Sequence, residues 1–202
     1  MNIVCLDLEG VLVPEIWIGL AERTGIEALR ATTRDVPDYD ELMQQRLRIL
    51  REHGLGMDDI QAVIDAVRPF PGAREFLHWV RERYQLVILS DTFYEFARPL
   101  MRQLDWPTLF CHRLEVDGER RIVDYHLRLA DHKRAAVAAF QQLNFRVTAA
   151  GDSYNDTGML SQAEQGILFA PPQNVIDDFP QFPVTREYDA LKDAIQQAFA
   201  HS

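Results

Sequence analysis

The sequence predicts an α/β fold in which a mostly parallel sheet carries helices on both faces. Short apolar segments alternate with segments whose apolar residues recur at helical spacing. Such alternation is typical of parallel sheets whose two faces are both covered. Only residues 14–71 interrupt it, because they contain helical patterns alone. We therefore expect residues 1–13 and 72–202 to form the core, and residues 14–71 to form a helical cap.

Proline and glycine mark the ends of the helices that we predict in the insert. The first begins at Pro14 and ends at Gly25, since proline suits the first turn and glycine the position after the last. The second is expected at residues 38–54, with Asp38 as its N-cap. The third is expected at residues 57–67, where prolines follow.

Strands and helices alternate through the rest of the chain. The predicted strands are 2–6 before the insert and 86–90, 146–152 and 166–170 after it; the predicted helices are 73–84, 93–104, 131–143, 155–164 and 186–200. Asp117 and Gly118 lie between two alternating segments, which indicates a β-hairpin over residues 113–127. Pro99 is expected either to kink its helix or to mark where it begins.

Composition excludes several classes of function. The formal net charge is -10, with 21 basic and 31 acidic residues, which argues against a nucleic-acid-binding surface. We expect no membrane span, because no uncharged stretch reaches about 18 residues. We expect no signal peptide, because Asp7 and Glu9 interrupt the first apolar run. Cys5 and Cys111 belong to no metal or redox motif and are interpreted as reduced thiols, so a cytoplasmic location is expected.

Carboxylates follow two of the predicted strands. Asp7 and Glu9 are two residues apart, so they point to the same side of an extended chain. Asp152 and Asp156 come at the end of a later strand. The carboxyl ends of parallel strands meet at one edge of the sheet, where ligands bind. Several carboxylates at one point favour Mg²⁺, which prefers oxygen ligands.

Four motifs occur in an order that resembles the haloacid dehalogenase (HAD) superfamily of phosphotransferases. They are DLEGV at residues 7–11, Ser90 after an apolar strand, Lys133 at the start of a helix, and GDSYND at residues 151–156. The resemblance implies a HAD-like Rossmannoid fold with a helical cap after the first strand.

A finer resemblance concerns the cap and the residues next to the motifs. Glu15 and Arg46 resemble the cap residues of phosphoserine phosphatases. The segments DLEGVLVPEIW, SDTF and GDSYNDT are similar to phosphoserine phosphatases that can also transfer phosphate to homoserine. The resemblance implies a small-molecule substrate, O-phospho-L-serine, with homoserine as a second acceptor, and it allows a homodimer.

The resemblance also assigns roles at the ends of the strands. Asp7 is the nucleophile that forms an aspartyl-phosphate, and Glu9 is the acid that protonates the leaving seryl oxygen and then serves as base. Asp7, Asp152 and the backbone carbonyl of Glu9 are expected to hold Mg²⁺. Asp156 is expected to be a supporting or alternate ligand. The superfamily usually has aspartate where this chain has Glu9.

Four further residues are predicted to face the substrate. Ser90 is expected to donate to the phosphate and Lys133 to neutralise it, although a lone lysine after Asp131 would suit a surface. Asn155 is expected to touch substrate, or to be only a turn residue. Asp91 stands beside the phosphate site where most phosphoserine phosphatases have glycine. The segment at residues 90–95 also fits a helix N-cap, because Thr92 and Glu95 have capping-box spacing.

Arg46 is the most informative residue of the predicted cap. It lies three or four positions from apolar residues, so it shares the face that is expected to be buried. An inward guanidinium needs a partner, and a substrate carboxylate is a good one; the alternative is an arginine whose head group reaches solvent. Glu15 is expected to bind a substrate ammonium, or simply to occupy a favourable first-turn position.

Other functions remain open at this stage. A HAD phosphatase for another small phosphomonoester is one alternative. A receiver-like module that accepts phosphate on aspartate is another, but the helical insert and Glu9 argue against it. Dehalogenase chemistry would give no role to Glu9 as a proton donor or to the metal ligands.

Overall fold

The computed structural model describes residues 1–32, 35–36 and 38–200. In this part of the chain one sheet has the strand order β4-β3-β2-β1-β5-β6-β7. The strands are β1 (Asn2–Leu6), β2 (Gln85–Phe93), β3 (Leu109–Val116), β4 (Ile122–His126), β5 (Arg146–Gly151), β6 (Gln165–Phe169) and β7 (Val184–Thr185). All neighbouring strands run parallel except β3 and β4, which form the antiparallel hairpin. The predicted α/β fold is confirmed.

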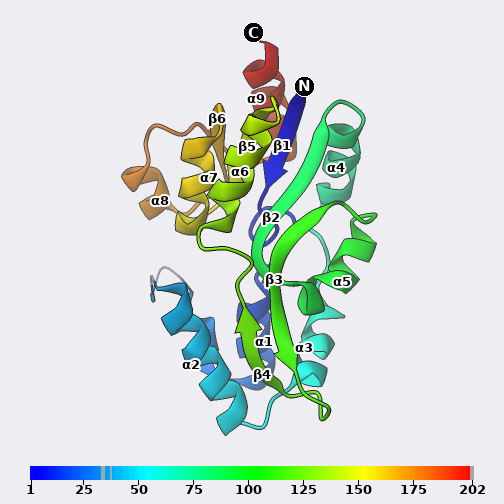
Figure 1. The fold of residues 1–202 in the computed structure, drawn as a ribbon, viewed down its shortest axis with the longest axis vertical. Coiled ribbons are helices and arrows are strands. Elements are labelled where there is room, and N and C mark those ends of the chain that lie inside the picture. Colours follow the sequence, from blue (N-terminus) through cyan, green and yellow to red (C-terminus); the bar gives the residue numbers. More distant parts are fainter. Residues whose placement is uncertain (33–34, 37, 201–202) are drawn as a thin grey trace.

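Helices cover both faces of the sheet (Figure 1). They are α4 (Ala73–Arg81), α5 (Tyr94–Gln103), α6 (His132–Gln142), α7 (Thr157–Gln162), α8 (Gln173–Asp178) and α9 (Tyr188–Ala200). Because strand side chains alternate between faces, Leu6 packs in the cluster that includes Phe76 of α4, whereas Cys5 packs in the cluster that includes Val137 of α6. The sheet therefore separates two apolar clusters, and both free thiols, Cys5 and Cys111, are buried.

The helices of the insert gather at the end of the molecule away from the two termini, beside the β3–β4 hairpin (Figure 1). They are α1 (Ile16–Thr24), the 3₁₀ helix η1 (Glu27–Arg30), α2 (Tyr39–Glu52) and α3 (Met57–Ile64). The hairpin is tied to them: Met57 N–H donates to the Arg120 carbonyl at 2.9 Å, and the Tyr125 hydroxyl donates to Asp40 at 2.5 Å. The division into core and cap at residues 14–71 stays a prediction.

The structure corrects the prediction of a helix cap after Ser90. Strand β2 continues to Phe93, and α5 begins only at Tyr94 with no side-chain cap. Leu89 and Phe93 both pair with β3, with a register shift between them, and the strand runs through the residues in between. Glu95 instead accepts a hydrogen bond from the Leu114 N–H at 2.9 Å, which leaves no capping box. Ser90, Asp91 and Thr92 are therefore presented by a strand and not by a helix N-terminus.

Two smaller differences concern helices. Pro99 lies inside α5 and does not mark its beginning. The predicted helix at 155–164 divides into a short 3₁₀ turn, η2 (Tyr154–Asp156), and α7. No helix in the described ranges is long and apolar enough to cross a membrane.

Candidate active site

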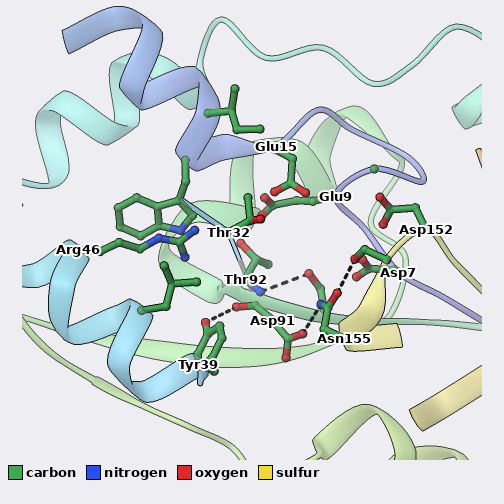
Figure 2. Close-up of a pocket in the computed structure, with 16 residues that line it drawn as sticks. Asp7, Glu9, Glu15, Thr32, Tyr39, Arg46, Asp91, Thr92, Asp152 and Asn155 are labelled. Carbon is green, nitrogen blue, oxygen red and sulfur yellow. Dashed lines mark hydrogen bonds between the residues drawn. The ribbon is translucent and has the colours of Figure 1, made fainter. Parts of the chain in front are cut away.

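The predicted functional residues surround one cavity at the carboxyl ends of β1, β2 and β5 (Figure 2). Its volume is about 170 Å³, and α1 and α2 close the opposite side. Eight of the ten residues predicted for the site line it: Asp7, Glu9, Glu15, Arg46, Ser90, Asp91, Asp152 and Asn155. The other two, Lys133 and Asp156, are buried directly behind its wall.

Three buried carboxylates form the acidic centre of the site. Oxygens of Asp7, Asp152 and Asp156 all lie within 4.8 Å of one another. Gly10 makes this approach feasible: its φ is +79°, and a Cβ there would lie 2.5 Å from the Asp152 carboxylate. The glycine of the first motif thus allows the end of β5 to pack against the end of β1.

Asp156 differs from the other two carboxylates because protein donors already occupy its oxygens. Oδ1 accepts from Lys133 Nζ at 2.8 Å, and Oδ2 accepts from the backbone N–H groups of Asp152 at 2.9 Å and Ser153 at 3.2 Å. Of its two predicted roles, support of the metal ligands fits these contacts better than direct ligation.

The remaining carboxylates fit a divalent cation. Asp7 Oδ1 is buried and makes no hydrogen bond in the described structure, although Lys133 Nζ lies 3.0 Å away. Burial, and then the nearby charge of Asp156, raise the pKa of Asp7 well above its usual range. A cation would reverse this effect, because a bound metal favours ionised ligands. Oxygen donors from two strand ends suit Mg²⁺.

The Glu9 carboxyl group stands apart from this acidic centre. It accepts a hydrogen bond from the Ile16 N–H at 3.1 Å and faces Glu15 (Figure 2). Burial and the adjacent Glu15 raise the pKa of Glu9 to about 8, against opposing hydrogen bonds from Ile16 and Thr92. A carboxyl group with such a pKa is protonated at neutral pH, as a general acid requires.

Lys133 is the cation that pairs with the carboxylates of the site. It is only 2% exposed, which excludes the alternative of a surface lysine. Its Nζ lies 2.8 Å from Asp156, 3.0 Å from Asp7 and 3.2 Å from Asp91. Burial alone would lower the pKa of Lys133, but these three carboxylates hold it well above the usual range. The ammonium group is therefore charged at neutral pH and lies beside Asp7.

Ser90, Asp91 and Asn155 form the wall next to Lys133. The Ser90 hydroxyl is buried and accepts from the Thr92 N–H at 3.3 Å. Asn155 Nδ2 donates to Asp91 Oδ2 at 2.6 Å, so the two side chains bind each other. Asn155 also belongs to the short 3₁₀ helix at residues 154–156, and its contact with substrate stays a prediction.

Arg46 is buried on the inner face of α2, as its spacing predicts, and is 6% exposed. Its guanidinium lies 4.4 Å from the centre of the Trp17 ring, and Nη2 donates to the Ala31 carbonyl at 3.0 Å. Nε has no hydrogen-bond partner among the described residues. The head group faces the cavity (Figure 2), so the solvent-reaching alternative is wrong.

Sequence reasoning missed several residues around the cavity, including two aromatic residues of the insert and two histidines. Tyr39 and Trp17 line it, and the Tyr39 hydroxyl donates to the Asp91 carbonyl at 2.7 Å. His112 and His132 are buried behind Asp91. The sequence gives no signal for the histidines, because they come from separate elements, β3 and α6, and belong to no motif.

Comparisons with known proteins agree with this geometry. The chain is 63% identical over 202 residues to the phosphoserine phosphatase ThrH of Pseudomonas aeruginosa, covering 100% of this chain and 98% of that protein. It is 65% identical over 192 residues to a phosphoserine phosphatase of Pseudomonas syringae pv. tomato, covering 95% and 81%.

Solved structures share the fold at low sequence identity. The phospho-aspartyl intermediate analogue of a phosphoserine phosphatase has a TM-score of 0.80 and 17% identity, with 96% of this chain and 98% of that chain covered. Residues 1–164 match the family model described as haloacid dehalogenase-like hydrolase. The chain therefore belongs to the haloacid dehalogenase-like hydrolase family.

Proposed function

We propose that this protein is a Mg²⁺-dependent phosphatase that hydrolyses O-phospho-L-serine through an aspartyl-phosphate on Asp7. The observation that carries the proposal is the pairing of two unlike walls around one small cavity. One wall presents buried carboxylates and a lysine, and the other presents the buried guanidinium of Arg46. The names of the two Pseudomonas relatives support the same substrate.

On the first wall, Asp7 attacks phosphorus as the bond to the seryl oxygen breaks, and Glu9 delivers its proton to that oxygen. Ser90 and Lys133 hold the phosphate oxygens, since phosphoryl transfer depends mainly on positioning and electrostatics. Asp7, Asp152 and the Glu9 backbone carbonyl would hold Mg²⁺, which offsets the negative charge of the carboxylates and the phosphate. Water then attacks the aspartyl-phosphate, with the deprotonated Glu9 as base.

On the second wall, Arg46 has hydrogen-bonding capacity left for a carboxylate, because its Nε has no partner in the described part of the chain. Glu15 lines the same cavity and would bind the ammonium group. We propose that the helices of residues 14–71 act as the cap that carries this amino-acid site, in a protein of the cytoplasm.

We propose further that homoserine can replace water as the acceptor, on the basis of the motif resemblance. Homoserine carries the same ammonium and carboxylate groups as serine, so Glu15 and Arg46 could orient it in the same way. Its hydroxyl would then lie near phosphorus, with Glu9 as base. Correct orientation of the homoserine hydroxyl can outweigh the high concentration of water, because well-oriented reacting groups reach effective molarities of about 10⁵ M.

One experiment separates these proposals. The protein is incubated with Mg²⁺ and a panel of small phosphomonoesters, with and without millimolar homoserine, and inorganic phosphate and phosphohomoserine are quantified. Preferential turnover of phosphoserine supports the phosphatase, and a better ester in the panel would replace phosphoserine as the substrate. If all released phosphate stays inorganic when homoserine is present, the transfer proposal is wrong and the hydrolysis proposal stands.

A further inference from the structure

A second polar cluster, Asp91 with His112 and His132, lies directly behind the phosphate side of the cavity. Both histidines are buried, at 2% and 4% exposure. Their Nε2 atoms lie 3.4 Å and 3.1 Å from the same oxygen, Asp91 Oδ1. The rings are in contact, with centres 4.4 Å apart. The proposed reaction gives these two histidines no role.

The two oxygens of Asp91 face different partners. Oδ1 faces the two imidazoles, whereas Oδ2 accepts from Asn155 Nδ2 at 2.6 Å and lies 3.2 Å from Lys133 Nζ. Asp91 is therefore a bridge between the histidines and two residues of the predicted substrate site. Four donors thus surround its carboxylate, and Asp91 also lines the cavity. Direct binding of substrate by Asp91 stays a prediction.

Hydrogen bonding favours this network over a cation site made of the same three residues. The Arg128 N–H donates to His112 Nδ1 at 3.1 Å, so that nitrogen is an acceptor and the ring proton is on Nε2, facing Asp91. A metal on Nε2 would move the proton to Nδ1, against the Arg128 N–H. Burial lowers the pKa of His132, which favours a neutral ring whose one N–H faces Asp91.

The consequence is an anion with a fixed orientation. Burial alone would raise the pKa of Asp91, but Lys133 and the two imidazole N–H groups hold it well below its usual range. The anion in turn orients Asn155, whose Oδ1 accepts from the Ser153 hydroxyl at 2.5 Å, so both ends of the amide are held. A buried charge keeps such a position only while its partners are present.

We propose that His112 and His132 are positioning residues that act through Asp91 to hold Lys133 and Asn155 at the phosphate subsite. The inference rests on the proposed phosphatase function for its kinetic consequences. It differs from the roles assigned above, because neither histidine touches the substrate. It also gives a reason for aspartate at position 91.

The test removes one donor while keeping the ring shape. His132→Phe should lower kcat/KM for phosphoserine and for phenyl phosphate to the same extent, by about tenfold, because one hydrogen bond to a charged group is lost. Binding of inorganic phosphate to the Mg²⁺-loaded protein, measured by calorimetry, should weaken by a similar factor. His132→Gln keeps an N–H at the reach of Nε2 and should restore most of both losses.

A double-mutant cycle separates action through Asp91 from a general structural role. Asp91→Asn should reduce both quantities at least as much as His132→Phe does. Adding His132→Phe to Asp91→Asn should cost little more, because the route through the carboxylate is already lost. If His132→Phe does not fold, His132→Asn, whose amide is too short to reach Asp91, takes its place in the cycle.

The matched control is His126→Phe, since His126 pairs with Glu115 at 3.2 Å on the exposed hairpin. It should leave kcat/KM and phosphate binding unchanged. Fully additive losses in the cycle, or a lower melting temperature with unchanged phosphate binding, would overturn the proposal. The calorimetric measurement needs no turnover. Weakened phosphate binding in a protein that does not hydrolyse phosphoserine would therefore reject the proposed function and keep the positioning role.

Discussion

The cavity has a strand wall at the ends of β1, β2 and β5, which carries Asp7, Ser90 and Asp152, and a helix wall on α1 and α2, which carries Trp17, Tyr39 and Arg46. The two walls leave opposite kinds of hydrogen-bonding capacity unused. On the strand wall, Asp7 Oδ1 accepts no hydrogen bond from any described residue, so the spare capacity is that of an anion. On the helix wall, Arg46 Nε donates none in the part of the chain that the structure describes, so the spare capacity is that of a cation. The first suits a metal ion and the second suits a carboxylate. In the proposed function, the sheet therefore carries the reaction and the insert selects the substrate.

This separation makes a general prediction about substrates. Changes on the strand wall should reduce turnover of every phosphomonoester to a similar degree, because each ester presents the same phosphate. Changes on the helix wall should reduce only the turnover of esters that carry an amino-acid group. Comparing the turnover of phosphoserine with that of phenyl phosphate, which lacks that group, therefore tests whether a residue acts on the phosphate or on the amino-acid group.

The largest effect is expected for Asp7→Asn on the strand wall. The amide keeps the shape but loses both the nucleophile and a metal charge, so kcat should fall by more than about a thousandfold for both esters. Steady-state kinetics with phosphoserine and phenyl phosphate measure it, and thermal unfolding checks that the fold is intact. If several per cent of the activity remains, and mass spectrometry excludes deamidation, Asp7 is not the nucleophile.

Glu9→Gln should have the next largest effect, and it distinguishes proton donation to the leaving group from the other roles of the strand wall. Loss of a general acid typically costs about a hundredfold or more in rate. That loss should appear with phosphoserine, whose seryl oxygen needs a proton. It should be much smaller with p-nitrophenyl phosphate, whose leaving group is stable as an anion. Equal losses with the two esters would show that Glu9 acts on binding or on the metal rather than on the leaving group.

The sequence predicts the strand wall better than its surroundings. Asp7, Glu9, Asp152 and the glycine that lets the strand ends meet can be located because each follows an apolar strand. The periodicity of residues 38–54 also places Arg46 correctly on the buried face. These features depend on local order, which the sequence carries directly.

The network around Asp91 could not be predicted in the same way. His112 lies on β3 and His132 on α6, and they meet only because β3 and α6 both adjoin the end of β2. Ser90 to Thr92 are likewise part of a strand whose flanking residues, Leu89 and Phe93, both pair with β3. Local capping signals favoured a helix there, but pairing with a neighbouring strand decided the outcome.

Arg46→Ala tests the helix wall, with a smaller and selective effect. Loss of a charged hydrogen bond costs about 1.5–3 kcal/mol, so kcat/KM for phosphoserine should fall roughly tenfold to a hundredfold. Phenyl phosphate should be hydrolysed almost as well as before. Arg48→Ala, on the exposed side of the same helix, is the matched control and should change neither. Equal losses on both esters would assign Arg46 a structural role, through its contact with Trp17.

The smallest effect is expected for Tyr39→Phe, which removes the hydrogen bond between α2 and the strand wall. The Tyr39 hydroxyl on α2 donates to the Asp91 carbonyl on β2 at 2.7 Å. Loss of a neutral hydrogen bond should lower the free energy of unfolding by about 0.5–1.5 kcal/mol. Because the bond fixes the helix wall against the phosphate strand, kcat/KM should fall severalfold for phosphoserine and less for phenyl phosphate.

Tyr125→Phe is the matched control for this last change. It removes the hydrogen bond from the hairpin to Asp40 on the same helix, away from the cavity. It should leave kcat/KM for both esters unchanged. Because the hydrogen bond between Tyr125 and Asp40 is exposed, its loss should change the urea midpoint only slightly. If Tyr39→Phe also lowers the urea midpoint without affecting phosphoserine turnover, the bond stabilises the fold only. The alignment of α2 with β2 would then come from apolar packing, through α2 residues such as Met43 and Leu47 in the cluster that contains Phe93 of β2.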